Sequence, residues 1–81
     1  MMIKVKVTAY ATLKKYIPQI KIGEFLTLEL PEGTQLKEIY DRFLIPQEEV
    51  KQVFINGLRA ENDTILKEDD RIAIFPPVAG G

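Results

Sequence analysis

The fold is decided by the stretch TQLKEIYDRFL, residues 34–44. Its apolar side chains recur at the spacing of a single helical face, at Leu36, Ile39, Tyr40, Phe43 and Leu44. Thr34 is expected to cap the helix, because a threonine hydroxyl can accept a backbone N–H of the first turn. This pattern predicts one helix whose apolar side faces a core.

The segments on both sides of this helix have the period-two alternation of strands. Residues 3–9 and 25–30 precede it, residues 50–55 and 71–75 follow it, and 58–60 is a short return strand after Asn56-Gly57. Asn-Gly favours a type I′ hairpin turn, in which both residues have positive φ. In the turn before the last strand, Asp69 is expected to have a left-handed conformation. A right-handed crossover puts the helix on one face of the sheet.

This order of elements predicts an α+β fold of the β-grasp type, a mixed sheet packed on one main helix. We expect the last strand to lie in the centre of the sheet, parallel to the first. The predicted domain covers residues 1–75, and residues 76–81 form a flexible C-terminal tail ending in Gly-Gly.

Composition excludes several classes of function. The 81 residues are 46% hydrophobic and 28% charged, as in an ordinary globular domain. Cysteine and histidine are both absent, which removes thiolate nucleophiles and the commonest general base and metal ligand. We therefore expect no metal site and no cofactor bound by the chain, and we expect its chemistry to be performed on it by partners.

Charge and hydropathy bear on partners and location. Five lysines precede residue 24 without interleaved arginines, which is a poor nucleic-acid footprint, and we expect no nucleic-acid partner. The cluster Glu68-Asp69-Asp70 is a candidate for steering the domain toward a basic partner. No apolar run approaches the roughly 20 residues that span a bilayer, and no signal peptide is evident, so we expect no membrane partner and a cytoplasmic location.

The last seven residues, FPPVAGG, are the candidate functional segment. The two prolines cannot continue a central strand and favour an extended exit from the domain. Two glycines without a Cβ follow. A stiff base, a slim tip and a terminal carboxylate suit insertion into a narrow active site of another protein. A frayed end without a function is the simpler alternative.

Together these pieces resemble the small, sulfur-carrying subunits of molybdopterin synthase, within the ubiquitin-like sulfur-carrier family. The matching segments are YATLK (residues 10–14), LPEGT (30–34), Asn56-Gly57, KEDD (67–70) and the terminal FPPVAGG. The family usually has glycine in the final turn, where this chain has Asp69.

The resemblance implies a reaction cycle on Gly81. A ubiquitin-activating-type adenylyltransferase would use magnesium ATP to convert the Gly81 carboxylate to an acyl adenylate, and a sulfur donor would leave a thiocarboxylate. The large subunit of molybdopterin synthase, in a complex of two small and two large subunits, would hold precursor Z against that sulfur. The resemblance also assigns roles to other residues: insertion of the tail to Gly80, Ala79, Val78, Pro77 and Pro76, and partner contacts to Phe75, Tyr10 and Leu58.

Several alternatives stay open on the sequence. A related carrier would deliver sulfur to thiamine or transfer RNA. A ubiquitin-like protein modifier would be conjugated through Gly81 to lysine amines, and it shares the adenylate step. A plain binding module would have an idle tail. Tyr10 and Phe75 could also serve only to pack against a neighbouring strand.

Overall fold

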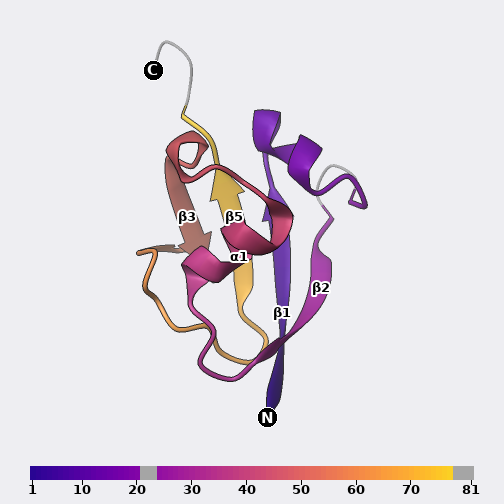
Figure 1. The fold of residues 1–81 in the computed structure, drawn as a ribbon, viewed down its shortest axis with the longest axis vertical. Helices are drawn as coiled ribbons and strands as arrows, with labels where there is room; N and C mark the ends of the chain where they lie inside the picture. Colours follow the sequence, from indigo (N-terminus) through magenta and orange to yellow (C-terminus); the bar gives the residue numbers. More distant parts are fainter. Residues whose placement is uncertain (21–23, 78–81) are drawn as a thin grey trace.

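A mixed β-sheet organises the computed structural model, which describes residues 1–20 and 24–77. Over these residues the strands are β1 (Met2–Ala9), β2 (Leu26–Pro31), β3 (Gln52–Ile55), β4 (Leu58–Ala60) and β5 (Arg71–Phe75). They lie in the order β2-β1-β5-β3-β4, with β1 and β5 parallel and the other pairs antiparallel (Figure 1). The predicted β-grasp sheet, with the last strand beside the first in its centre, is confirmed.

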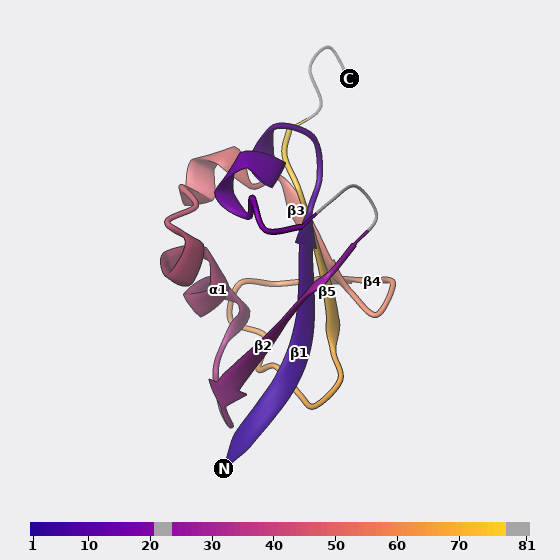
Figure 2. The same ribbon diagram turned by 90° about the vertical axis from the view of Figure 1, so that its right-hand side faces the viewer.

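One face of the sheet is covered by helical segments. The helix α1 (Leu36–Phe43) and the 3₁₀ turns η1 (Ala11–Tyr16) and η2 (Gln47–Glu49) all lie on this side, as the edge-on view in Figure 2 shows. Alternate strand residues such as Val5, Val7, Ile72 and Ile74 are buried against them. We call the other side of the sheet the open face. Among the described residues no helix is long and apolar enough to span a bilayer.

Two details of the predicted helix are wrong. Gln35, and not Thr34, is the N-cap residue, and the Glu38 carboxylate accepts the Gln35 N–H at 2.8 Å. Thr34 cannot serve there because its hydroxyl closes the preceding turn, donating to the Pro31 carbonyl at 2.7 Å. Leu44 does not join the buried stripe: it has φ 57° and ψ 40°, which turns the chain out of the helix and leaves the side chain 82% exposed.

Both predicted left-handed turns are confirmed. Asn56 and Gly57 have φ of 56° and 84°, as a type I′ turn between β3 and β4 requires. Asp69 has φ 68° in the turn that leads into β5. These turns set the registers of β4 and β5, and hence the side chains that reach the open face.

Candidate functional site: an aromatic face at the base of the tail

The last strand holds the base of the predicted tail rigidly. The Ile74 carbonyl accepts the Tyr10 N–H at 3.0 Å on one side, and the Phe75 carbonyl accepts the Lys51 N–H at 2.9 Å on the other. Pro76 is buried and Pro77 is exposed. Val78, Ala79, Gly80 and Gly81, to which the sequence assigned tail insertion and the reaction, lie outside the described residues.

Aromatic rings cluster on the open face beside this base. Tyr10 and Phe75 are stacked, with ring centroids 4.6 Å apart and an interplanar angle of 9°. The Phe54 ring meets Phe75 edge to face, with centroids 5.7 Å apart and an angle of 86°. All three side chains are half-buried, so each keeps part of its surface for a partner. With Phe25 on the same side, we call Tyr10, Phe25, Phe54 and Phe75 the aromatic face.

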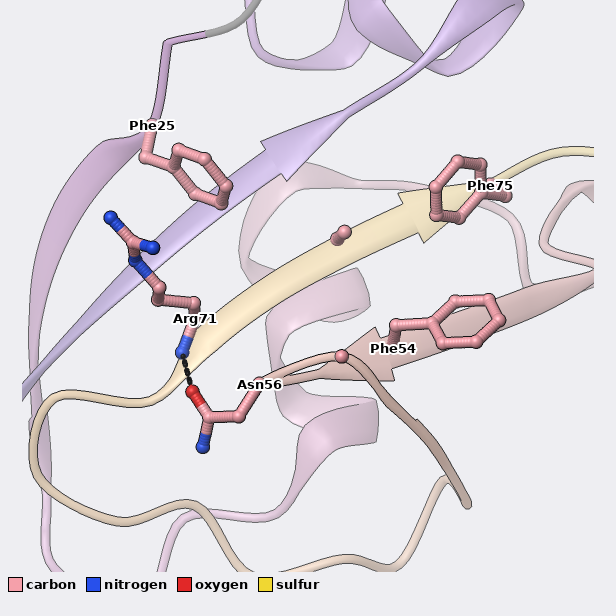
Figure 3. Close-up of a pocket in the computed structure, with 7 residues that line it drawn as sticks. Phe25, Phe54, Asn56, Arg71 and Phe75 are labelled. Carbon is pink, nitrogen blue, oxygen red and sulfur yellow. Dashed lines mark hydrogen bonds between the residues drawn. The ribbon is translucent and has the colours of Figure 1, made fainter.

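A groove runs along this face from Phe25 to Phe75. It has a volume of about 610 Å³, and Phe25, Phe54, Phe75, Ala73, Arg71 and the Asn56-Gly57 turn line it (Figure 3). Its aromatic lining and its single charged residue are typical of a recognition surface. The Arg71 guanidinium lies over the Phe25 ring, 5.6 Å from the centroid, at the distance of a cation–π contact.

A hydrogen-bond network fixes the position of Arg71. The Arg71 N–H donates to Asn56 Oδ1 at 3.0 Å, and the Asn56 amide donates to Asp70 Oδ1 at 2.9 Å. The Lys67 N–H donates to Asp70 Oδ2 at 2.8 Å. These hydrogen bonds connect the hairpin turn to the turn before β5. The Arg71 side chain extends from there over the open face.

The acidic cluster at residues 68–70 is largely used within the fold. Asp70 is buried, with both of its carboxylate oxygens accepting hydrogen bonds. Glu68 accepts the Lys4 N–H at 2.9 Å. Only Asp69 of the three carboxylates has no such role among the described residues, so the cluster is a weaker candidate for steering a basic partner than its sequence suggested.

Leu58 does not lie with the other two predicted partner contacts. Its register partner across the hairpin is Ile55, whose side chain is buried on the helix side of the sheet. Directly opposed residues point to the same face. Leu58 is 74% exposed there, beside a second cavity that Ile65 also lines. The structure therefore brings Tyr10 and Phe75 together and places Leu58 on the opposite side.

Three residues of the aromatic groove were missed at the sequence level: Phe25, Phe54 and Arg71. A signal for the two phenylalanines was present, because each lies out of phase with the buried positions of its strand segment. A single exposed apolar residue is normal on a protein surface, whereas a contiguous apolar patch marks an interaction site. Their convergence could not be deduced, since it depends on the order β2-β1-β5-β3 of the strands in the sheet.

A side-chain hydrogen bond connects the two 3₁₀ turns at the end of the sheet where β5 ends (Figure 1). The Tyr16 hydroxyl of η1 donates to both oxygens of Glu49 in η2, at 3.1 and 3.2 Å. Desolvation, the hydrogen bond to Glu49 and the nearby negative charge raise the pKa of Tyr16 above its usual value. The pair joins the segments on either side of the tail base.

The chain was compared with known protein families, with proteins of curated function and with solved structures. The model of the ThiS family matches residues 11–81. No protein of curated function matches the chain in sequence.

Many solved structures are similar to the chain, among them the following three. One is the complex of subunits 1 and 2 of the molybdopterin-converting factor from Helicobacter pylori, 26% identical, with all of both chains covered and a TM-score of 0.61. A putative subunit 1 of that factor from Pyrococcus furiosus is 23% identical, with 94% of this chain and 99% of that chain covered and a TM-score of 0.69. Small archaeal modifier protein 1 from Methanosarcina acetivorans is 23% identical, with 100% and 99% covered and a TM-score of 0.66.

Proposed function

The chain belongs to the ThiS family of ubiquitin-like sulfur carriers, and from this premise we propose that it carries sulfur on Gly81 for molybdopterin synthesis. The Helicobacter pylori structure is the observation that favours molybdopterin synthesis over other sulfur-carrier pathways. It matches this chain from end to end and is a complex of two subunits of a molybdopterin-converting factor. The aromatic face supports the same choice, because Phe75 ends β5 at the base of the tail and offers a docking surface there.

In the proposed cycle, a carboxylate must first be activated because it is a poor electrophile. An adenylyltransferase of the ubiquitin-activating type joins the Gly81 carboxylate to AMP from magnesium ATP, and pyrophosphate leaves. A sulfur donor displaces AMP and leaves a C-terminal thiocarboxylate. Neither histidine nor cysteine is present in this chain, so the acid–base groups for both steps belong to the partners.

The large synthase subunit then receives the tail, in a complex of two small and two large subunits. The thiocarboxylate sulfur attacks precursor Z there, and two successive deliveries build the dithiolene. Gly80 suits this step because a residue without a Cβ fits a channel that excludes side chains. Pro76 and Pro77 lower the entropic cost of ordering the inserted tail. Docking through Phe75 and Tyr10 positions the tail at the channel entrance.

A second candidate function is protein modification through Gly81. The similarity to small archaeal modifier protein 1 over nearly all of both chains favours keeping it, although at 23% identity this likeness concerns the fold. Both functions begin with the same adenylate. They differ in the nucleophile that then displaces AMP from the Gly81 acyl group. For the carrier this is the sulfur of a sulfur donor, and for the modifier it is a lysine amine. Carriers for thiamine or transfer RNA form the same thiocarboxylate.

The test is the intact mass of the protein after incubation with the adenylyltransferase of its own organism, magnesium ATP and sulfide. We expect a gain equal to the exchange of one oxygen for sulfur, located in the C-terminal peptide. A variant without Gly80 and Gly81 is the control: it should fold normally and gain nothing. The thiocarboxylate form should then convert precursor Z with the large subunit. Adducts on target lysines in cell extract, without thiocarboxylate, would contradict the carrier function.

A further inference from the structure

The charged residues of the strands are distributed unevenly over the molecule. The described strands contain five charged residues, namely Lys4, Lys6, Glu29, Arg59 and Arg71, and each alternates with residues of the helix-side face. All five therefore belong to the open face. Four cations against one carboxylate give the strand residues of this face a charge of +3, although the whole chain has a formal net charge of −1. The open face is basic on an otherwise acidic domain.

Among the described strand residues, the register places a carboxylate opposite only one of these four cations. Glu29 lies directly opposite Lys4 in the register of β1 and β2. The register partners of the other three cations on the described strands are not carboxylates. Lys6 and Arg71 are register partners on the adjacent strands β1 and β5. Like charges placed opposite one another destabilise a sheet. The Arg71 guanidinium lies over the Phe25 ring, 5.6 Å from its centroid.

One of the two arginines lines the aromatic groove, and the other is paired with a residue that lines it. Arg71 lines it and lies over the Phe25 ring. Arg59 is the register partner of Phe54 on β4, so the two side chains are neighbours on the open face. The arrangement is an apolar centre with a cationic rim, in which arginine is suited to paired hydrogen bonds with a carboxylate.

We propose that the open face docks an acidic protein surface, with apolar side chains in the groove and carboxylates paired with Arg71 and Arg59. This inference rests on the proposed function, because the partner in question is a protein that receives the tail. The groove is continuous with the tail base through Phe75, so that partner covers the rim as it takes the tail. A nucleic acid is disfavoured because the half-buried rings are packed on one another instead of being presented singly for stacking.

The experiment compares Arg71→Glu and Arg59→Glu with Arg42→Glu, a control that makes the same charge change on α1, on the other side of the sheet. Binding to the large synthase subunit and to the adenylyltransferase of the same organism is measured by calorimetry at low and high sodium chloride. Circular dichroism and thermal unfolding establish that each variant is folded. A labelled oligonucleotide is tested in parallel.

We expect each open-face reversal to weaken binding to at least one of these proteins about tenfold, since a charge pair is lost and a repulsion is introduced. Arg42→Glu should bind like the wild type. Raising the salt concentration should weaken the wild type more than Arg71→Glu.

Three results would overturn the inference. Wild-type binding with equal affinity for all three variants would reject the acidic partner surface and leave the proposed function standing, as would an effect of Arg71→Glu on the oligonucleotide alone. A wild-type chain that binds neither protein would count against the proposed function, and this inference would fall with it.

Discussion

Tyr10 and Phe75 stack ring on ring at a centroid distance of 4.6 Å, although one follows the first strand and the other ends the last. The contact exists because β1 and β5 are parallel neighbours, with Ala9 opposite Ile74 at the end of their register. It lies where β5 ends, so the same side chains that complete the sheet form the surface at the base of the tail.

Replacing Phe75 tests this double role. Phe75→Ala removes the stack on Tyr10 and the edge contact with Phe54, and we expect a loss of about 1–3 kcal/mol in the free energy of unfolding. Binding to the large subunit should weaken as well. Leu58→Ala is the comparison, because Leu58 is exposed on the other face and should cost less than about 0.5 kcal/mol. If Leu58→Ala weakens binding as much as Phe75→Ala, the partner reaches beyond the open face.

The Asp70 carboxylate should matter more for stability than the neighbouring Asp69. Asp70→Asn replaces one of two accepting oxygens by an amide that cannot accept, so the Asn56 amide or the Lys67 N–H loses its partner. A buried donor without a partner costs about 1–3 kcal/mol. Asp69→Asn removes the same charge and tolerates the left-handed conformation. Urea unfolding should separate the two variants; equal midpoints would mean that the network contributes little.

The end of α1 offers a stabilising substitution. Leu44 has a left-handed conformation, which is sterically unfavourable for leucine but not for glycine. Its side chain is exposed and therefore contributes little burial energy. We expect Leu44→Gly to raise the free energy of unfolding by about 1 kcal/mol. Leu44→Ala removes the same apolar surface but keeps the Cβ, and it should give no such gain. Thermal melts of the pair isolate the backbone effect, and a gain in both variants would assign it to the side chain instead.

Alkaline pH should destabilise the fold through Tyr40. Burial raises the pKa of its hydroxyl to about 12, whereas an unfolded tyrosine titrates near 10. The unfolded state therefore loses the proton first, so the stabilisation is complete below about pH 10 and is lost as the pH rises toward 12. The Tyr40→Phe variant lacks this titration.

Unfolding free energies of the wild type and Tyr40→Phe, measured from pH 7 to 12, check this expectation. At pH 7 the variant should be less stable by about 1 kcal/mol, because the hydroxyl donates to Asn62 Oδ1 at 3.1 Å. The difference should shrink above pH 10. Parallel pH profiles would show that Tyr40 ionises equally in the two states.

The order of elements and the two left-handed turns were determined by the sequence alone. Alternation over residues 3–9 and 71–75, the helical spacing of residues 36–43 and the Asn56-Gly57 dipeptide are local signals, and each is read within a few residues. The position of Leu58 was within reach too, because a two-residue turn after Ile55 pairs the two residues on one face.

Only the tertiary structure decided how the site is assembled. Which outward-facing residues meet depends on the sheet order β2-β1-β5-β3-β4, so the cluster of Tyr10, Phe54 and Phe75 and the cationic rim at Arg71 become visible only in the folded chain. Local competition decided the rest: Thr34 bonds to the preceding turn and leaves the helix cap to Gln35. Side-chain periodicity specifies which face a residue occupies, whereas register between distant strands specifies its neighbours there.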